Sequence, residues 1–235
     1  MKPLPRAVLV LVGASAVVAV PYLVMGVLDV ESGRARLDLL VPLLVIAFLL
    51  SLRPIRVQTN TELSPSDVAV LTGIVLLPPG AVALLAAGGR LLTDVFTRKK
   101  PIQILRNVAA TAVATGSGAV MYQVVHGQVA TSYDPAAATI LAGVVAVVFL
   151  VGLDIVQIAL LQRALGNMTF DSSAVQWIGR TMRAQFLWSL AAVITLQVVL
   201  IEPWFLVPGI PLFVMGYLDI RARFAAERRA RPPAG

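Results

Sequence analysis

Long apolar segments recur along this chain of 235 residues and restrict it to very few folds. A helix that crosses a lipid bilayer needs about 20 mostly apolar residues. Four runs have about this length, at residues 7–28, 102–125, 136–161 and 184–201, and two shorter runs lie at 37–52 and 204–220. Charged residues make up only 13% of the chain, about half of their usual share in soluble domains. The sequence therefore predicts an all-α polytopic integral membrane helical bundle.

One further apolar segment, residues 68–96, is long but broken at Pro78-Pro79-Gly80. Proline removes a backbone donor and clashes with the preceding turn, so we expect the helix to break there. Two topologies follow: a single kinked span, or a re-entrant hairpin that enters and leaves on one side.

Basic residues decide between these topologies, because Lys and Arg concentrate in cytoplasmic loops. Lys2 and Arg6 place the N-terminus inside, and Arg53 and Arg56 are inside again two spans later. The cluster 98–100 that follows the broken segment should also be cytoplasmic, and only a hairpin connects two ends on one side.

The outer loops then keep only Arg34 and Arg36 of the 19 basic residues. We expect six spans plus the re-entrant hairpin, with both termini on the cytoplasmic side of the plasma membrane. Residues 1–220 form one transmembrane domain, and residues 221–235 form a short basic tail that can contact anionic lipid.

The Pro-Pro-Gly tip has two interpretations. Broken backbone inside a membrane must be buried in protein or line a polar cavity, so the tip can mark a cavity or be a tight turn packed between helices. Small residues at four-residue spacing, such as Ala110, Ala114 and Gly118, allow close helix packing. We assign them to contacts within the chain, with a homodimer contact as the alternative.

Ionisable residues inside the predicted spans are the main functional signal, since an unpaired charge in lipid is costly. Asp154 and Arg90 lie at equal predicted depth and have opposite signs, so they are candidate partners. The remaining members of the candidate cluster are Asp94, Arg106, Asn107 and Gln157. Asn107, Thr111 and Thr115 share one helix face, which we expect to turn inward.

This cluster is either a small polar pocket in the cytoplasmic half or a closed structural network that fixes the hairpin. Arg106 has a further alternative, because it could extend to the lipid headgroups instead.

Several functional classes are disfavoured by the sequence. The chain has no Cys and a single His, His126, which leaves no thiolate or histidine metal site. No phosphate-binding glycine loop and no nucleophile with a neighbouring base is present, so we expect neither an enzyme nor a cofactor. The net charge of +7 comes from clusters between apolar runs, which favours membrane topology over nucleic-acid binding.

The order of several short motifs resembles a known family over about residues 35–225. These motifs are Leu63-Ser64-Pro65-Ser66-Asp67, Leu77-Pro78-Pro79, Arg98-Lys99-Lys100-Pro101, Leu105-Arg106-Asn107-Val108-Ala109, Leu165-Gly166-Asn167, and Pro203, Pro208 and Pro211. They are similar to the N-terminal multi-helix membrane sensor domain of bacterial GGDEF and HD-GYP cyclic-dinucleotide signalling proteins. The resemblance implies a sensory module that binds a small or lipidic ligand.

The chain departs from that family at three points. Arg106 stands where an aromatic residue is frequent, and Asp154 stands where Asn is frequent. The family's last helix leads into an output domain, whereas here residues 221–231 lead only to Pro232-Pro233-Ala234-Gly235. We expect a stand-alone version, a truncated one, or a subunit that signals through a separate partner.

A second resemblance is to the substrate-binding S component of energy-coupling-factor micronutrient transporters, which are also small, basic, six-helix proteins. Their docking surface on the first helix is an alanine pair, whereas this chain has Ser15 and Ala19 at that spacing. Two alternatives to the sensor thus stay open: a transport subunit, and a scaffold that organises membrane partners.

Overall fold

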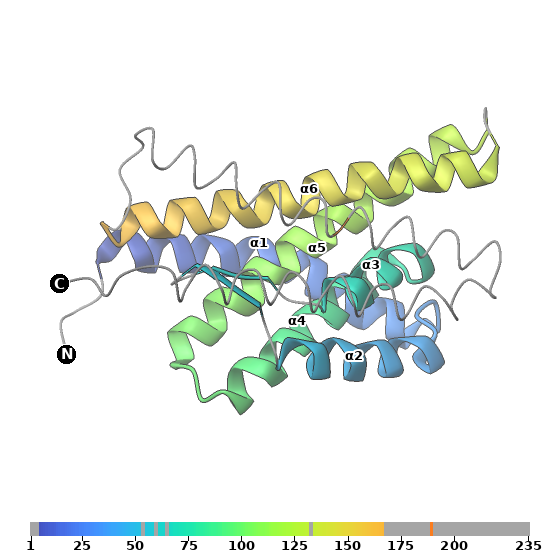
Figure 1. Ribbon diagram of the computed structural model, residues 1–235. Coiled ribbons are helices and arrows are strands. Elements are labelled where there is room, and N and C mark those ends of the chain that lie inside the picture. The colour runs from blue at the N-terminus through green and yellow to red at the C-terminus, as the bar shows by residue number, and fades with distance from the viewer. Residues whose placement is uncertain are drawn as a thin grey trace.

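The computed structural model describes residues 5–52, 55–58, 61–63, 66–131, 134–166 and residue 189. Within those ranges the chain forms six α-helices and one pair of short strands (Figure 1). The helices are α1 (Arg6–Glu31), α2 (Leu37–Ser51), α3 (Asp67–Leu76), α4 (Pro79–Phe96), α5 (Pro101–Val129) and α6 (Pro135–Ala164). Of these, α1, α4, α5 and α6 are long and apolar enough to cross a membrane, which confirms the helical membrane class.

The predicted apolar runs coincide with helices to within a few residues. Runs 7–28, 37–52, 102–125 and 136–161 correspond to α1, α2, α5 and α6. Helices α1, α5 and α6 extend a few residues beyond their apolar runs. Apart from residue 189, the runs 184–201 and 204–220 and the tail 221–235 lie outside the described residues.

A strand pair between α2 and α3 departs from the all-α prediction. β1 (Ile55–Gln58) and β2 (Thr61–Leu63) pair antiparallel, with Ile55 opposite Leu63 and an irregular register between Arg56 and Gln58. Strands of three and four residues are too short to produce a recognisable alternation in the sequence.

The broken segment forms two helices, as predicted. Leu77 and Pro78 are extended, so α3 ends at Leu76 and α4 begins at Pro79. Proline is favourable at the first position of a helix, because an N–H at that position would have no acceptor within the helix. The Pro-Pro pair therefore ends one helix and starts the next.

The hairpin tip is a tightly packed turn rather than the wall of a cavity. A Cβ added at Gly26 of α1 would overlap the carbonyl oxygen of Gly80, and one added at Gly80 would lie 2.7 Å from Oδ2 of Asp29. Asp29 is 3% exposed and forms an ion pair of 2.9 Å with Arg34. The two glycines let the start of α4 lie directly on the end of α1.

Among the described helices, α5 packs against α4, α6 and α1, and in Figure 1 it runs diagonally across α1. A Cβ at Gly118 would lie 3.1 Å from the carbonyl oxygen of Ala146 in α6. The Tyr22 hydroxyl of α1 lies 2.8 Å from Ser117 Oγ. The small residues of α5 thus make contacts within the chain.

The first helix presents apolar side chains outward along its whole length. Val10 and Val17 are 71% and 72% exposed. A soluble protein cannot leave such a surface in water, whereas lipid solvates it.

Candidate functional site

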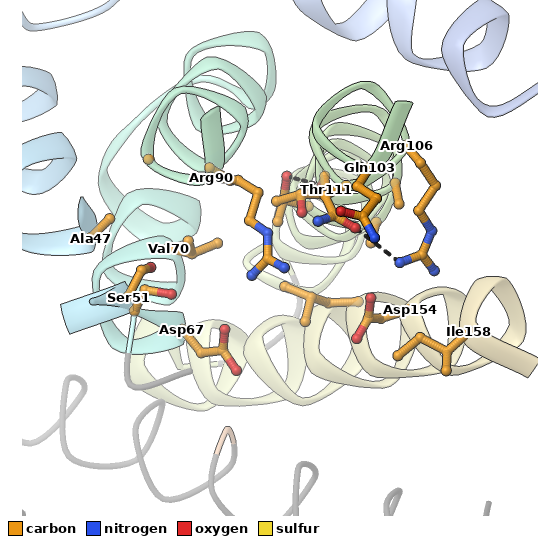
Figure 2. A pocket seen from close by; sticks show the side chains of 18 of the residues that line it. Ala47, Ser51, Asp67, Val70, Arg90, Gln103, Arg106, Thr111, Asp154 and Ile158 are labelled. Atoms are coloured by element: carbon orange, nitrogen blue, oxygen red, sulfur yellow. Dashed lines mark hydrogen bonds between the residues drawn. The ribbon is translucent and has the colours of Figure 1, made fainter. Parts of the chain in front are cut away.

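A cavity of about 440 Å³ lies between α2, α3, α4, α5 and α6 (Figure 2). Its size falls within the range of about 300–1,000 Å³ that is usual for small-molecule sites. Its charged and hydrogen-bonding lining residues are Ser51, Ser66, Asp67, Arg90, Lys99, Gln103, Arg106, Asn107, Thr111, Thr115, Asp154 and Gln162. Such a lining is unusual inside a bundle whose other faces are apolar.

One face of α5 supplies much of this lining. Gln103, Asn107, Thr111 and Thr115 follow one another at four-residue intervals and all line the cavity. Residues four apart lie on one side of a helix, so the polar stripe seen in the sequence runs along the cavity. The Thr115 hydroxyl donates to the carbonyl oxygen of Thr111 at 2.7 Å, which satisfies it within the helix.

Asp94 is fully buried and lies just behind the cavity as the centre of a clamp. Its Oδ1 forms ion pairs with Lys99 Nζ at 2.8 Å and with Arg90 Nε at 3.4 Å. Its Oδ2 accepts a hydrogen bond of 2.6 Å from Asn107 Nδ2. These contacts join the end of α4, the turn after it and the start of α5, so Asp94 has a structural role.

Arg90 connects this clamp to the cavity. Its ion pair with Asp94 comes from four-residue spacing on α4. Figure 2 shows its guanidinium pointing into the space that the carboxylates of Asp67 and Asp154 also face. The expected partners Arg90 and Asp154 therefore line one cavity.

Arg106 also lines the cavity. It is half-buried, its Nη1 donates to Asn107 Oδ1 at 3.1 Å, and its charge interacts with that of Asp154. Its Nη2 is buried without a hydrogen-bond partner among the residues that the structure describes. A buried guanidinium nitrogen in this state is an open position for an acceptor.

Gln157 lies outside the cavity lining. Its Nε2 donates to the carbonyl oxygen of Ala110 at 3.3 Å, which ties α6 to α5. The predicted cluster thus separates into cavity residues (Arg90, Arg106, Asn107 and Asp154) and residues that hold helices together (Asp94 and Gln157).

Asp67, Lys99 and Gln103 line the cavity but were missing from the predicted cluster. Asp67 begins α3, and its carboxylate is repelled by Asp154 and attracted by Arg90. Its position follows from the shortness of α3, which the apolar pattern did not define. The signal that could have found it is the Ser66-Asp67 pair at a helix start, typical of an N-terminus.

Searches against protein-family models, curated proteins and solved structures found no match. Among the residues that the structure describes, no group of three or more His, Asp or Glu side chains is arranged to hold a metal ion. The site is therefore interpreted from its own geometry and charge.

Proposed function

We propose that this protein is a membrane-embedded sensory module that binds a small polar ligand in the cavity between α2 and α6. The observation that carries the proposal is a hydrophilic cavity of small-molecule size inside an otherwise apolar bundle. Such a cavity is costly to maintain, because each buried charge loses its hydration. The side chains that line the cavity are suited to binding a ligand rather than to catalysis.

We further propose six spans with a re-entrant α3–α4 hairpin and a cavity in the cytoplasmic half of the membrane. Two contacts support this topology. Ser51 at the end of α2 and Lys99 after α4 line the same cavity, while Gly26 near the end of α1 packs against Gly80 at the hairpin tip. The ends that carry basic clusters therefore lie together, opposite the tip.

A sensor fits this location better than a transport subunit that captures a micronutrient from outside. Such a subunit needs a polar pocket that faces outward, whereas this cavity lies at the end of the bundle that holds Lys99 and Gln162. At the end that we propose faces outward, the hairpin tip packs directly on α1.

Arg90 offers a route by which binding can change the bundle. It reaches into the cavity, yet its Nε is tied to Asp94, which also holds Lys99 and Asn107. A ligand that draws the guanidinium away from Asp94 loosens the clamp between α4 and α5. Both helices would then shift relative to α6, against which α5 packs.

Gentle extraction from native membranes followed by native mass spectrometry tests the proposal. We expect the intact protein, or a homo-oligomer of it, to carry a small additional mass. Arg106→Gln should release that mass, whereas the matched change Arg36→Gln at an exposed ion pair on the outer end should retain it. Co-purification with a membrane coupling subunit and paired ATPases would instead support transport, and retention of the mass by Arg106→Gln would refute this site.

A further inference from the structure

We infer that the turn between α4 and α5, residues 97–100, binds an anionic phospholipid through the phosphate of its headgroup. This site goes beyond the proposed function, because its two free cations, Arg98 and Lys100, do not line the cavity. The inference follows from these cations, from the backbone that carries one of them, and from the apolar surface beside the turn.

Arg98 and Lys100 are cations without a counter-charge. Both are exposed, and neither side chain forms an ion pair within the part of the chain that the structure describes. Lys99 between them differs, because its Nζ pairs with Oδ1 of Asp94 at 2.8 Å. The turn therefore carries two positive charges that an anionic partner can offset.

The backbone of the turn is unusual for an arginine. Arg98 has a φ of 55°, in the left-handed region where a helix usually ends on glycine. The N–H of Arg98 donates to the carbonyl oxygen of Val95 at 3.0 Å. The N–H of the next residue, Lys99, donates to the carbonyl oxygen of Asp94 at 3.0 Å, which completes a Schellman motif.

Glycine would satisfy this turn at a lower backbone cost, so the side chain of Arg98 must supply a compensating advantage. Attraction to the negative end of α4 is one contribution. A bound phosphate is a second, and it is also favoured by the start of α5 at Pro101, because the N-terminal end of a helix attracts phosphate.

Exposed apolar side chains lie directly before the turn and indicate a lipid rather than a soluble anion. Val95 and Phe96 end α4 and are 56% and 68% exposed, and the exposed Leu91 and Leu92 lie one helical turn earlier on the same face. Phe48 of α2 packs edge to face on Phe96, with ring centroids 6.1 Å apart. The surface thus changes from apolar to cationic within a few residues, as the acyl chains and the phosphate of a phospholipid require.

Native mass spectrometry of the full-length protein in mixed micelles tests this site. The probes are phosphatidylglycerol and, with the same acyl chains, phosphatidylethanolamine, whose headgroup has no net charge. Two cations near a lipid surface should favour the anionic lipid by about 30-fold. Glycerophosphoglycerol, the same headgroup without acyl chains, should not displace the lipid at equal concentration.

Arg98→Gly separates lipid binding from folding. It removes the charge at a position where glycine fits the backbone, so thermal unfolding without added lipid should not occur at a lower temperature. Its affinity for phosphatidylglycerol should fall about fivefold, and Lys100→Gln in the same chain should lower it about fivefold further.

Arg6→Gln is the matched control, because it removes one exposed cation at the start of α1, on the same side of the proposed topology. This variant should keep the affinity of the natural sequence. An equal loss with Arg6→Gln would show a response to total charge and would overturn the site. Unchanged lipid binding by the double variant Arg98→Gly/Lys100→Gln would overturn it as well.

The remaining outcomes separate the lipid from other occupants. Displacement by glycerophosphoglycerol at equal concentration would assign the turn to a soluble anion and refute the lipid site. The lipid mass should depend on Arg98 and Lys100 and persist in Arg106→Gln, whereas the proposed cavity ligand depends on Arg106. The lipid site and the proposed function can therefore fail independently.

Discussion

The backbone of Gly80 lies so close to Gly26 that neither position has room for a side chain. This contact joins the tip of the α3–α4 hairpin to the end of α1, in the half of the bundle away from the cavity. Because neither glycine has a side chain, the start of α4 can lie directly against the backbone of α1. This contact fixes the position of α4 along α1, and with it the position of Arg90.

Gly26→Ala should destabilise the protein by about 1–3 kcal/mol, the usual range for overpacking a tight contact. The added Cβ meets a backbone oxygen of α4, which cannot rotate away as a side chain can. Gly13→Ala in the same helix is the matched control, since nothing lies within 4 Å of its added Cβ. The measurement is the free energy of unfolding in mixed detergent micelles. Equal values for the two variants would show that the α1–hairpin contact is not formed.

Asp94→Asn should cost about 1–3 kcal/mol of unfolding free energy, because it removes a fully buried carboxylate that accepts from Asn107 and that is the counter-charge of the half-buried Arg90 and Lys99. Asp38→Asn changes an ion pair with Arg36 whose side chains are 63% and 66% exposed, so it should cost less than about 1 kcal/mol. Thermal unfolding of the two variants side by side gives the comparison. A small effect at Asp94 would mean that Lys99 and Arg90 find compensation elsewhere, and the clamp would then lose its structural role.

The hairpin topology can be tested by cysteine labelling, since the natural chain has no Cys. Glu31→Cys and Lys100→Cys introduce single thiols at exposed positions. A membrane-impermeant maleimide added to intact cells should label the first and not the second, and inverted vesicles should give the opposite result. Labelling of both from one side would establish the kinked single span instead.

The hydrogen bond between Tyr22 and Ser117 should contribute a coupling energy of about 0.6 kcal/mol, the average for pairs between membrane helices. A double-mutant cycle with Tyr22→Phe and Ser117→Ala isolates this energy from the packing of the ring against Gly116. A coupling energy of zero would indicate that the ring packing alone joins α1 to α5.

Much of the fold could be predicted, because lipid imposes strong local rules. The apolar runs define α1, α2, α5 and α6 closely, and the Pro-Pro pair marks the break between α3 and α4. The strand pair could not be predicted, since it depends on pairing between two very short segments. The close approach of Gly26 and Gly80 involves residues distant in sequence, and hydrophobic periodicity does not predict such contacts.

The candidate site was predictable where a helix repeats a residue type on one face. The stripe of Asn107, Thr111 and Thr115 could be read directly from four-residue spacing. The ion-pair partners of Arg90 were harder to predict. Equal depth in the membrane indicated Asp154 as a candidate partner, whereas the ion pair with Asp94 comes from four-residue spacing on the same helix. Asp67 reaches the cavity only because α3 is short, and the apolar pattern did not reveal where that helix begins.

The unequal arms of the hairpin also determine how the membrane voltage acts on a ligand. Helices α3 and α4 have 10 and 18 residues, or about 15 and 27 Å, and they share one tip. α3 therefore begins about 12 Å short of the far end of α4, beside Arg90. In the proposed topology this end faces the cytoplasm, and lipid cannot satisfy non-helical backbone at that depth, so protein or water would fill the region between Asp67 and the cytoplasm. Most of the transmembrane potential would then fall across the outer half of the bundle. A charged molecule that enters from the cytoplasm would cross little of it, so its affinity should be nearly independent of voltage.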